Sequence, residues 1–206
     1  FKVYGPDIYA NIQKMSFLDH RGLFVKNLKG NYSFTQQHMI LDKMEIETKE
    51  SSIKGYAALN YEIEDFSDFQ NKVEFDVKIK SAKLASNDIR CFYDELGKYQ
   101  YFKLRSHITG SLNNLKFLDL YLNDNRGTKI VGFINFRNLL GTKDQKFYMN
   151  GKFDQLNANY DDLVGILPNV LGKKLPVILK KFGNISLCGN TQVTTTSIHA
   201  NLAANT

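Results

Sequence analysis

The sequence contains no apolar run that approaches the roughly 18 residues a membrane-spanning helix needs. It also shows no charged N-terminal region followed by an apolar stretch and a cleavage site, the pattern of a secretory signal peptide. The first residue is Phe1 rather than Met. We therefore expect a segment of a longer or processed chain, folded as one β-rich unit over residues 1–206.

Motifs that carry catalytic or metal chemistry are also missing. The four histidines are scattered, and no HExxH, GxSxG, nucleotide-binding loop or paired-carboxylate motif surrounds them. The two cysteines, Cys91 and Cys188, lie far apart and have neither a CxxC partner nor a histidine at ligand spacing. The sequence therefore predicts no enzyme, no metal site and no cofactor. It favours two buried free thiols, with a disulfide left open for an oxidising compartment.

The charge is basic but lacks a dense basic block. The chain has 27 Lys and Arg against 21 Asp and Glu, which gives a net charge of +6 and a pI of about 9.1. A nucleic-acid-binding arm would concentrate these charges, so no nucleic-acid partner is expected. Solvation of strand faces and turns accounts for the lysines. Attraction to acidic lipid head groups is the alternative.

Apolar and polar residues alternate along most of the chain. In Ser52–Glu64, for example, apolar residues occupy one side while Lys54, Asn60 and Glu62 occupy the other. A period of two is typical of a strand with one face in water and one face removed from it. The residues predicted to share an apolar groove are Ile53, Ala57, Leu59, Tyr61, Val73, Phe75, Val77, Ile79, Leu118, Leu120, Leu122, Ile130, Ile134 and Phe136.

The pattern predicts about a dozen strands joined in sequence order. Turn-forming residues such as Asn113–Asn114 and Asn123–Gly127 separate neighbours, so the strands should pair antiparallel as a meander. Glycines recur inside the strand patterns, as at Gly55 and Gly132, and predict positions where the sheet bends. The expected strands are residues 1–4, 8–18, 23–34, 39–48, 52–63, 72–84, 101–112, 116–123, 128–137, 146–158, 184–194 and 197–204.

Two segments depart from the β pattern. Residues 87–97 predict a short helix or turn that ends at Gly97. Residues 161–183 have helical apolar spacing behind an acidic first turn, and Pro168 and Pro176 should divide them into short pieces. This amphipathic segment either closes one end of the sheet or rests on a membrane. Its candidate head-group or membrane contacts are Lys173, Lys174, Lys180 and Lys181.

The predicted apolar face is too large for the predicted helices to cover. About ten strands, each roughly 20 Å long and about 4.8 Å apart, make a face on the order of 1,000 Å². A helix of about twenty residues covers roughly a third of it, and the remainder exceeds the apolar patches that monomers usually expose. The sheet could close as a sandwich or barrel, which the pattern by itself favours because most one-sided sheets pack on protein. Alternatively, it could curl into an open trough filled by acyl chains.

Two stretches resemble the repeating unit of the TamB/AsmA-like envelope proteins. They are GNYSFTQQHMILDKMEIETKESSIKGYAALNYE, residues 30–62, and HITGSLNNLKFLDLYLNDNRGTKIVGFINF, residues 107–136. Each has a glycine-started strand, an apolar strand that ends near Thr or Asn, a small polar turn and a strand with a central glycine. The segments SDFQNKVEFDVKIKSAKLASNDI and YDDLVGILPNVLGKKLPVILKKFGNISLCGN are also similar to TamB proteins of the Bacteroidetes type. The likeness covers the chain from about Gly30 onward, and its motifs consist of pattern and order.

The resemblance implies a mainly β fold: a long curled antiparallel meander, or β-taco, around an apolar groove. It also implies a non-catalytic segment of a periplasmic bridge, in a chain anchored in the inner membrane of a diderm bacterium. Such proteins support phospholipid transfer between the two membranes and outer-membrane protein assembly. The implied partners are phospholipid acyl chains, a TamA-type outer-membrane barrel and the inner membrane. The regions that contact the barrel and the anchor have no counterpart in these residues, so those two partners would be met through other parts of the chain.

Two further functions stay open on the sequence. An assembly module for outer-membrane proteins predicts exposed sheet edges to which a client adds strands. A structural or adhesive β-sandwich without lipid conduction predicts a closed core and no groove.

Overall fold

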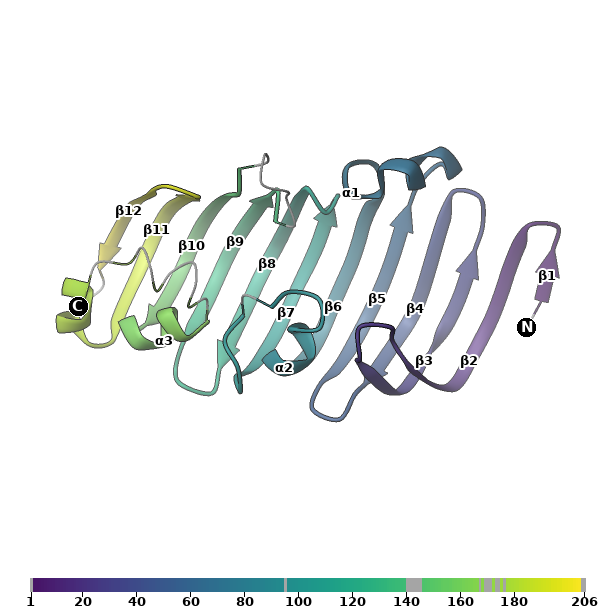
Figure 1. Cartoon of the computed structure of the whole chain (residues 1–206), viewed down its shortest axis with the longest axis horizontal. Helices are drawn as coiled ribbons and strands as arrows, with labels where there is room; N and C mark the ends of the chain where they lie inside the picture. The colour runs from purple at the N-terminus through teal and green to yellow at the C-terminus, as the bar shows by residue number, and fades with distance from the viewer. Residues whose placement is uncertain are drawn as a thin grey trace.

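The computed structural model describes residues 2–94, 96–139, 146–166, 168, 172, 175 and 177–204. Twelve strands form one sheet in which each strand pairs with its neighbours in sequence, in the order β1 to β12 (Figure 1). Every pairing is antiparallel, so the predicted meander and all twelve predicted strands are confirmed. The strands are β1 Lys2–Tyr4, β2 Asp7–Leu18, β3 Phe24–Phe34, β4 His38–Glu47, β5 Ser52–Asn60, β6 Glu74–Ala85, β7 Tyr101–Gly110, β8 Asn114–Asp124, β9 Lys129–Arg137, β10 Tyr148–Ala158, β11 Ile185–Thr194 and β12 Ile198–Ala204.

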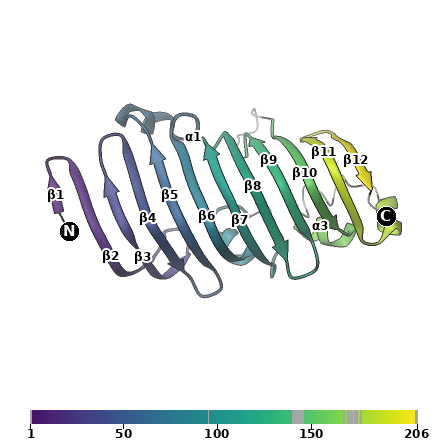
Figure 2. The ribbon, with the colours of Figure 1, turned by 180° about the vertical axis from the view of Figure 1, so that it is seen from behind.

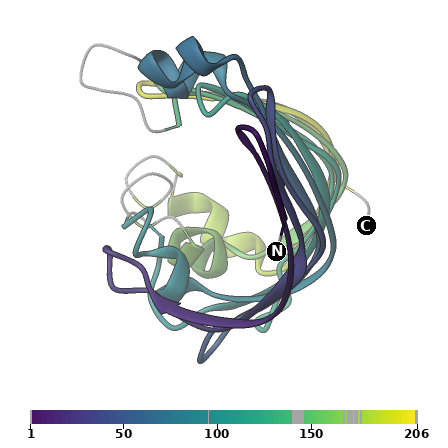
Figure 3. The same cartoon turned by 90° about the vertical axis from the view of Figure 1, so that its right-hand side faces the viewer.

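The sheet is open and bends into a C when seen along its length (Figure 3). Within the described residues, β1 pairs only with β2, and β12 pairs only with β11. None of the described elements forms a second layer on the convex side, which is seen face on in Figure 2. The closed sandwich or barrel favoured by the alternation alone is therefore wrong, and the open trough is the arrangement observed. The concave side is called the inner face below, and the convex side the outer face.

A line of glycines and register shifts explains why the strands bend. The register shifts between Leu41 and Met44 in β4, and it shifts again on β6, β8 and β10. An extra residue in one strand of a pair bends that strand. Four of the odd-numbered strands, β3, β5, β9 and β11, carry glycine at the same level: Gly30, Gly55, Gly132 and Gly189. A Cβ at Gly132 would lie only 2.1 Å from the carbonyl oxygen of Lys152, so the close strand approach at this level requires glycine.

Short helices lie at the two long rims of the curved sheet. At one rim lie the 3-10 helix η1 Ile63–Asp68 and α1 Phe69–Lys72, and at the other lie α2 Ser86–Ile89, α3 Tyr160–Ile166 and the 3-10 helix η2 Val177–Phe182 (Figures 1 and 3). Helices α2 and α3 lie on the concave side. The predicted long amphipathic segment is divided as expected, because α3 ends before Pro168 and η2 begins after Pro176. Of the helices that the structure describes, none is both long enough and apolar enough to cross a bilayer.

Helix α3 begins with its acidic turn close to a second buried carboxylate. The backbone N–H of Asp162 donates to Asn159 Oδ1 at 2.8 Å, which caps the helix. Asp162 is only 7% exposed. Burial raises the pKa of the Asp162 carboxyl above its ordinary value of 3.8, and the nearby Asp124 carboxylate adds to that rise. The Arg126 guanidinium offsets part of it. At neutral pH, Asp162 is therefore ionised at a cost to stability.

Replacing Asp162 with Asn should raise the free energy of unfolding at neutral pH. A carboxyl with a raised pKa binds its proton more readily in the folded state, so wild-type stability rises as the pH falls through that raised value. The advantage of Asp162→Asn should therefore shrink as the pH falls toward 3.8. Urea titrations of both proteins between about pH 7 and pH 4 measure this difference. A difference that stays constant across that range would contradict the prediction.

Candidate functional site

The inner face consists of rows of apolar side chains that run along the trough, across the strands. Residues paired across antiparallel strands point to the same face, so the register defines each row. The middle row spans β2 to β12 and contains no charged residue. Its members are Ala10, Tyr32, Leu41, Ala57, Val77, Ile108, Phe117, Ile134, Gly151, Thr191 and Ala200.

Neighbouring rows repeat this composition. A row on the side of the middle row toward α2 and α3 contains Ile53, Ala82, Leu104, Leu122 and Ile130 in β5 to β9, followed by an apolar residue in each remaining strand. The row between it and the middle row carries the glycines of the bend. None of these three rows contains Asp, Glu, Lys or Arg between β4 and β12. The middle row makes this wall uncharged from β2 to β12, and ten strand spacings of roughly 4.8 Å give it a length near 50 Å.

Most of this wall is only half-buried. Val77, Ile108, Leu122 and Ile130 keep part of their surface in contact with solvent. The best-packed part lies around Leu120, Ile134 and Phe153, with Phe117 and Leu122 among the residues against it. Side chains from neighbouring strands supply this packing, since no second sheet covers the face. A continuous apolar surface of this size favours an apolar occupant.

Eleven of the fourteen predicted groove residues lie on the inner face. The register places them in the same rows as the core around Leu120. They are Ile53, Ala57, Leu59, Phe75, Val77, Ile79, Leu120, Leu122, Ile130, Ile134 and Phe136.

Tyr61 and Val73 take part in packing at a rim rather than forming trough wall. Tyr61 is 5% exposed, and its hydroxyl donates to the carbonyl oxygen of Thr35 at 3.1 Å. Its ring also lies 4.6 Å from that of Phe66 in η1. Val73 is completely buried where α1 leads into β6. Both residues fasten the helical rim to the sheet.

The prediction for Leu118 is wrong, because this residue lies on the outer face. The register shifts between Phe117 and Leu120, and Asp119 has a left-handed backbone with a φ of 48°. This bulge adds a residue, so Phe117 and Leu120 both face inward while Leu118 pairs with His107 on the outer face. The His107 ring lies 2.7 Å from Asp76 there. When the alternation is extrapolated through a bulge, the residues at the bulge are assigned to the wrong face of the sheet.

Aromatic side chains gather at the rim that carries η1 and α1. Tyr61, Phe66 and Phe69 form a chain of ring contacts that continues to Phe34 on one side and Phe75 on the other. Farther along the same rim, Phe136 contacts both Phe117 and Phe147. Strands β3, β5 and β9 end at this rim while β6, β8 and β10 begin there, which is why residues distant in sequence meet.

The opposite rim is polar. The Asp88 carboxylate accepts hydrogen bonds from the hydroxyls of Thr48 at 2.6 Å and Ser51 at 2.5 Å. Asp124 Oδ1 accepts three backbone N–H bonds within its own turn, while Asp124 Oδ2 is buried without a hydrogen-bond partner. The trough therefore has one aromatic rim and one rim with hydrogen-bonded carboxylates, of which Asp124 is buried and Asp88 is half-buried.

The predicted lysine contacts are only partly defined. Lys173 and Lys174 lie outside the described residues. Lys180 and Lys181 are exposed on η2, and Lys180 Nζ pairs with Asp161 Oδ1 at 3.1 Å. Cys91 and Cys188 are free thiols as expected, but both are half-buried rather than buried. Among the described residues, no group of three or more His, Cys, Asp or Glu side chains could hold a metal ion.

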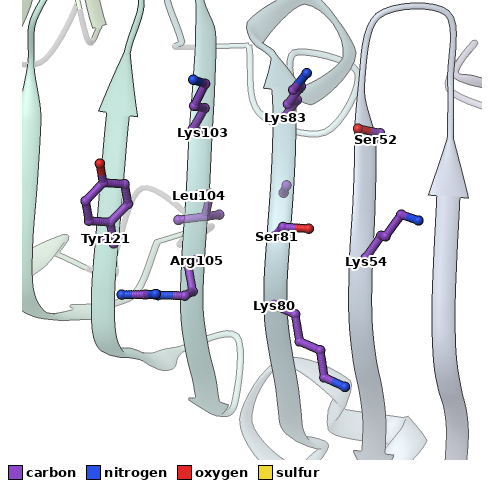
Figure 4. Close-up of a pocket in the computed structure, with 10 residues that line it drawn as sticks. Ser52, Lys54, Lys80, Ser81, Lys83, Lys103, Leu104, Arg105 and Tyr121 are labelled. Carbon is purple, nitrogen blue, oxygen red and sulfur yellow. The ribbon is translucent and has the colours of Figure 1, made fainter.

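A basic depression on the outer face was missed by the sequence reasoning. It has a volume of about 480 Å³ and lies over β5, β6, β7 and β8 (Figure 4). Single lysines at alternating positions are ordinary in solvated strands, and only the register brings these together. The charged and aromatic side chains at the depression are Lys54, Lys80, Lys83, Lys103, Arg105 and Tyr121.

Comparison with models of known protein families, with curated proteins and with solved structures finds no match.

Proposed function

We propose that this chain is a non-catalytic bridge segment in which phospholipid acyl chains lie against the inner face. The observation that carries the proposal is the middle row of residues. It crosses eleven strands without a charge, on a concave face that no second sheet covers in the described part of the chain. Aliphatic and aromatic side chains offer dispersion contacts to hydrocarbon and no hydrogen bonds that would select a head group.

The dimensions of the trough suit acyl chains. A bilayer hydrocarbon core is about 30 Å thick, so one acyl chain extends roughly 15 Å. The trough length of about 50 Å is several times this value. Each methylene group removed from water contributes about 0.8 kcal/mol, which makes burial of a whole chain favourable. Because neighbouring rows have similar composition, a lipid displaced by one strand loses little, and this favours sliding over capture at one position.

The two rims of the trough differ chemically, since one is aromatic and the other is polar. Acyl chains fit the apolar wall between the rims, while head groups stay in water at the open side of the C. The Phe66 and Phe69 rings at the aromatic rim add apolar surface for the chains. No residue is assigned to bond breaking, and direction of movement would come from outside this segment.

The resemblance to TamB/AsmA-like proteins supports the setting of the proposal. It favours the periplasm of a diderm bacterium and a role between the inner and outer membranes. In that setting, phospholipid transfer is the activity, and support of outer-membrane protein assembly is the related role. An inner-membrane anchor and a TamA-type barrel would be contacted through other parts of a longer chain.

Native mass spectrometry after gentle purification tests the proposal. We expect several phospholipid adducts on each chain, and we expect the chain stripped of lipid to take up a fluorescent phospholipid added from vesicles. Uptake should compete with unlabelled phospholipid and be insensitive to salt, because dispersion and burial of hydrocarbon hold the lipid. A folded chain with no adducts and no uptake would overturn the proposal and favour a structural or adhesive module.

A further inference from the structure

We propose that the depression on the outer face is a binding site for a phosphate-bearing anion, separate from the trough. Five cationic side chains from three neighbouring strands line the depression (Figure 4): Lys54, Lys80, Lys83, Lys103 and Arg105. These side chains leave the sheet on the side opposite to the middle row of the trough. A ligand at this site is therefore not the head group of a lipid whose chains occupy the inner face.

The positive charges of the site are mostly uncompensated within the chain. Lys54 Nζ pairs with Glu45 Oε1 at 3.2 Å. The other four cations have no carboxylate within 4.0 Å in the part of the chain that the structure describes. A ligand with two or more negative charges would neutralise them.

The strongest argument for an anion site is a pair of like charges on neighbouring strands. Lys83 in β6 is the register partner of Lys103 in β7. Like charges directly opposite on neighbouring strands destabilise a sheet. Both side chains are exposed at the rim of the depression and point the same way in Figure 4. An anion between or above them would turn this repulsion into attraction.

A bulge in β6 shapes the depression. The register shifts between Ile79 and Ala82, so Lys80 and Ser81 occupy the space that one residue would normally take. The bulge leaves Ser81 exposed at the centre of the site, where its hydroxyl can donate. It also interrupts the packing of outer side chains, which leaves room for a ligand.

The donor set favours phosphate. Lysine ammonium groups on long stems act as mobile point charges, and an arginine guanidinium binds phosphate oxygens through paired N–H groups. The Arg105 guanidinium carbon lies 5.7 Å from the centre of the Tyr121 ring, and this contact orients the group toward one side of the depression. The hydroxyls of Ser52 and Ser81 add neutral donors.

A phosphate group could come from a soluble ligand or from a lipid head group, and two probes separate these sources. Tripolyphosphate is titrated into the chain by calorimetry, and vesicles of phosphatidylglycerol with phosphatidylcholine are sedimented with it. The site variant carries Lys83→Gln, Lys103→Gln and Arg105→Gln. The matched control carries Lys14→Gln, Lys26→Gln and Lys152→Gln, three exposed lysines outside the depression. Both variants lose three positive charges.

We expect wild-type chain to bind at least one probe at about 0.1 M salt, with affinity about tenfold lower in the site variant and within about twofold of wild type in the control. Binding of tripolyphosphate alone identifies a soluble ligand, and binding of vesicles alone identifies a head group. Binding of neither probe, or equal losses in the two variants, would overturn the proposal. Phospholipid adducts in the trough should be the same in all three proteins, so failure here is distinguishable from failure of the proposed function.

Discussion

Val77→Arg together with Ile108→Arg should remove nearly all phospholipid from the chain. The two residues are register partners in the middle row, between Ala57 and Phe117, and both are half-buried on the inner face. Arginine at these positions would place two charges at the centre of the trough. A charge held in hydrocarbon costs about 2.5–3.5 kcal/mol even where side chains can reach toward water. We expect native mass spectra to show at least a tenfold loss of lipid adducts. A tenfold loss corresponds to roughly half of the free energy that one charge in hydrocarbon costs.

Substitutions at these half-buried positions test lipid binding with less risk of unfolding than substitutions of core residues would. Leu120 and Ile134 are 4% and 8% exposed, so a charge at either site would unfold the sheet around them. The matched control, Thr109→Arg with Gln192→Arg, adds the same charge on the outer face of β7 and β11. The control should keep its lipid. Should the inner-face double variant fail to fold, Ile108→Gln introduces a neutral polar group at the same place. A folded inner-face variant with the lipid content of the control would refute the trough as the binding surface.

The second large effect concerns the bend of the sheet. Gly55→Ala should lower the free energy of unfolding by about 2–4 kcal/mol, in the range of severe overpacking. A Cβ at Gly55 would lie 2.0 Å from the carbonyl oxygen of Lys78 on β6, and backbone atoms cannot move aside as the end of a side chain can. The strands would have to separate at the bend, with loss of hydrogen bonds there. Urea denaturation followed by far-UV circular dichroism measures the change.

Gly127→Ala is the control for this glycine effect. Gly127 lies in the turn after β8 with a φ of 107°, and nothing lies within 4 Å of the position that a Cβ would take. This substitution should cost only the conformational strain of the turn, about 1 kcal/mol. Equal costs for Gly55→Ala and Gly127→Ala would show that close strand approach does not set the bend. A trough flattened in Gly55→Ala should also bind less phospholipid per folded chain.

Local sequence signals were sufficient for the strands and their order. Each of the twelve predicted ranges overlaps one observed strand, because the alternation of apolar and polar residues is a property of each strand by itself and most connections are short turns. The division of residues 161–183 also followed from local chemistry, since proline at 168 and 176 prevents one continuous helix. Most groove residues were found for the same reason. A residue two positions from an inward residue faces inward as long as no bulge intervenes.

The failures lie where pairing between strands decides the outcome. Leu118 was placed on the wrong face because the bulge at Asp119 depends on the register between β8 and its neighbours. The basic depression was missed because Lys83 and Lys103 are twenty positions apart in sequence and meet only as register partners. Neither the bulge nor the lysine pair produces a recognisable pattern in the sequence of a single strand.

The sequence by itself determined a one-sided antiparallel meander, because side-chain alternation and turn residues act over a few positions. Only the tertiary structure decided that the sheet stays open, where it bends, and which charges share its outer surface. Closure and curvature depend on register shifts and glycines aligned across many strands, and that alignment exists only once the strands have paired.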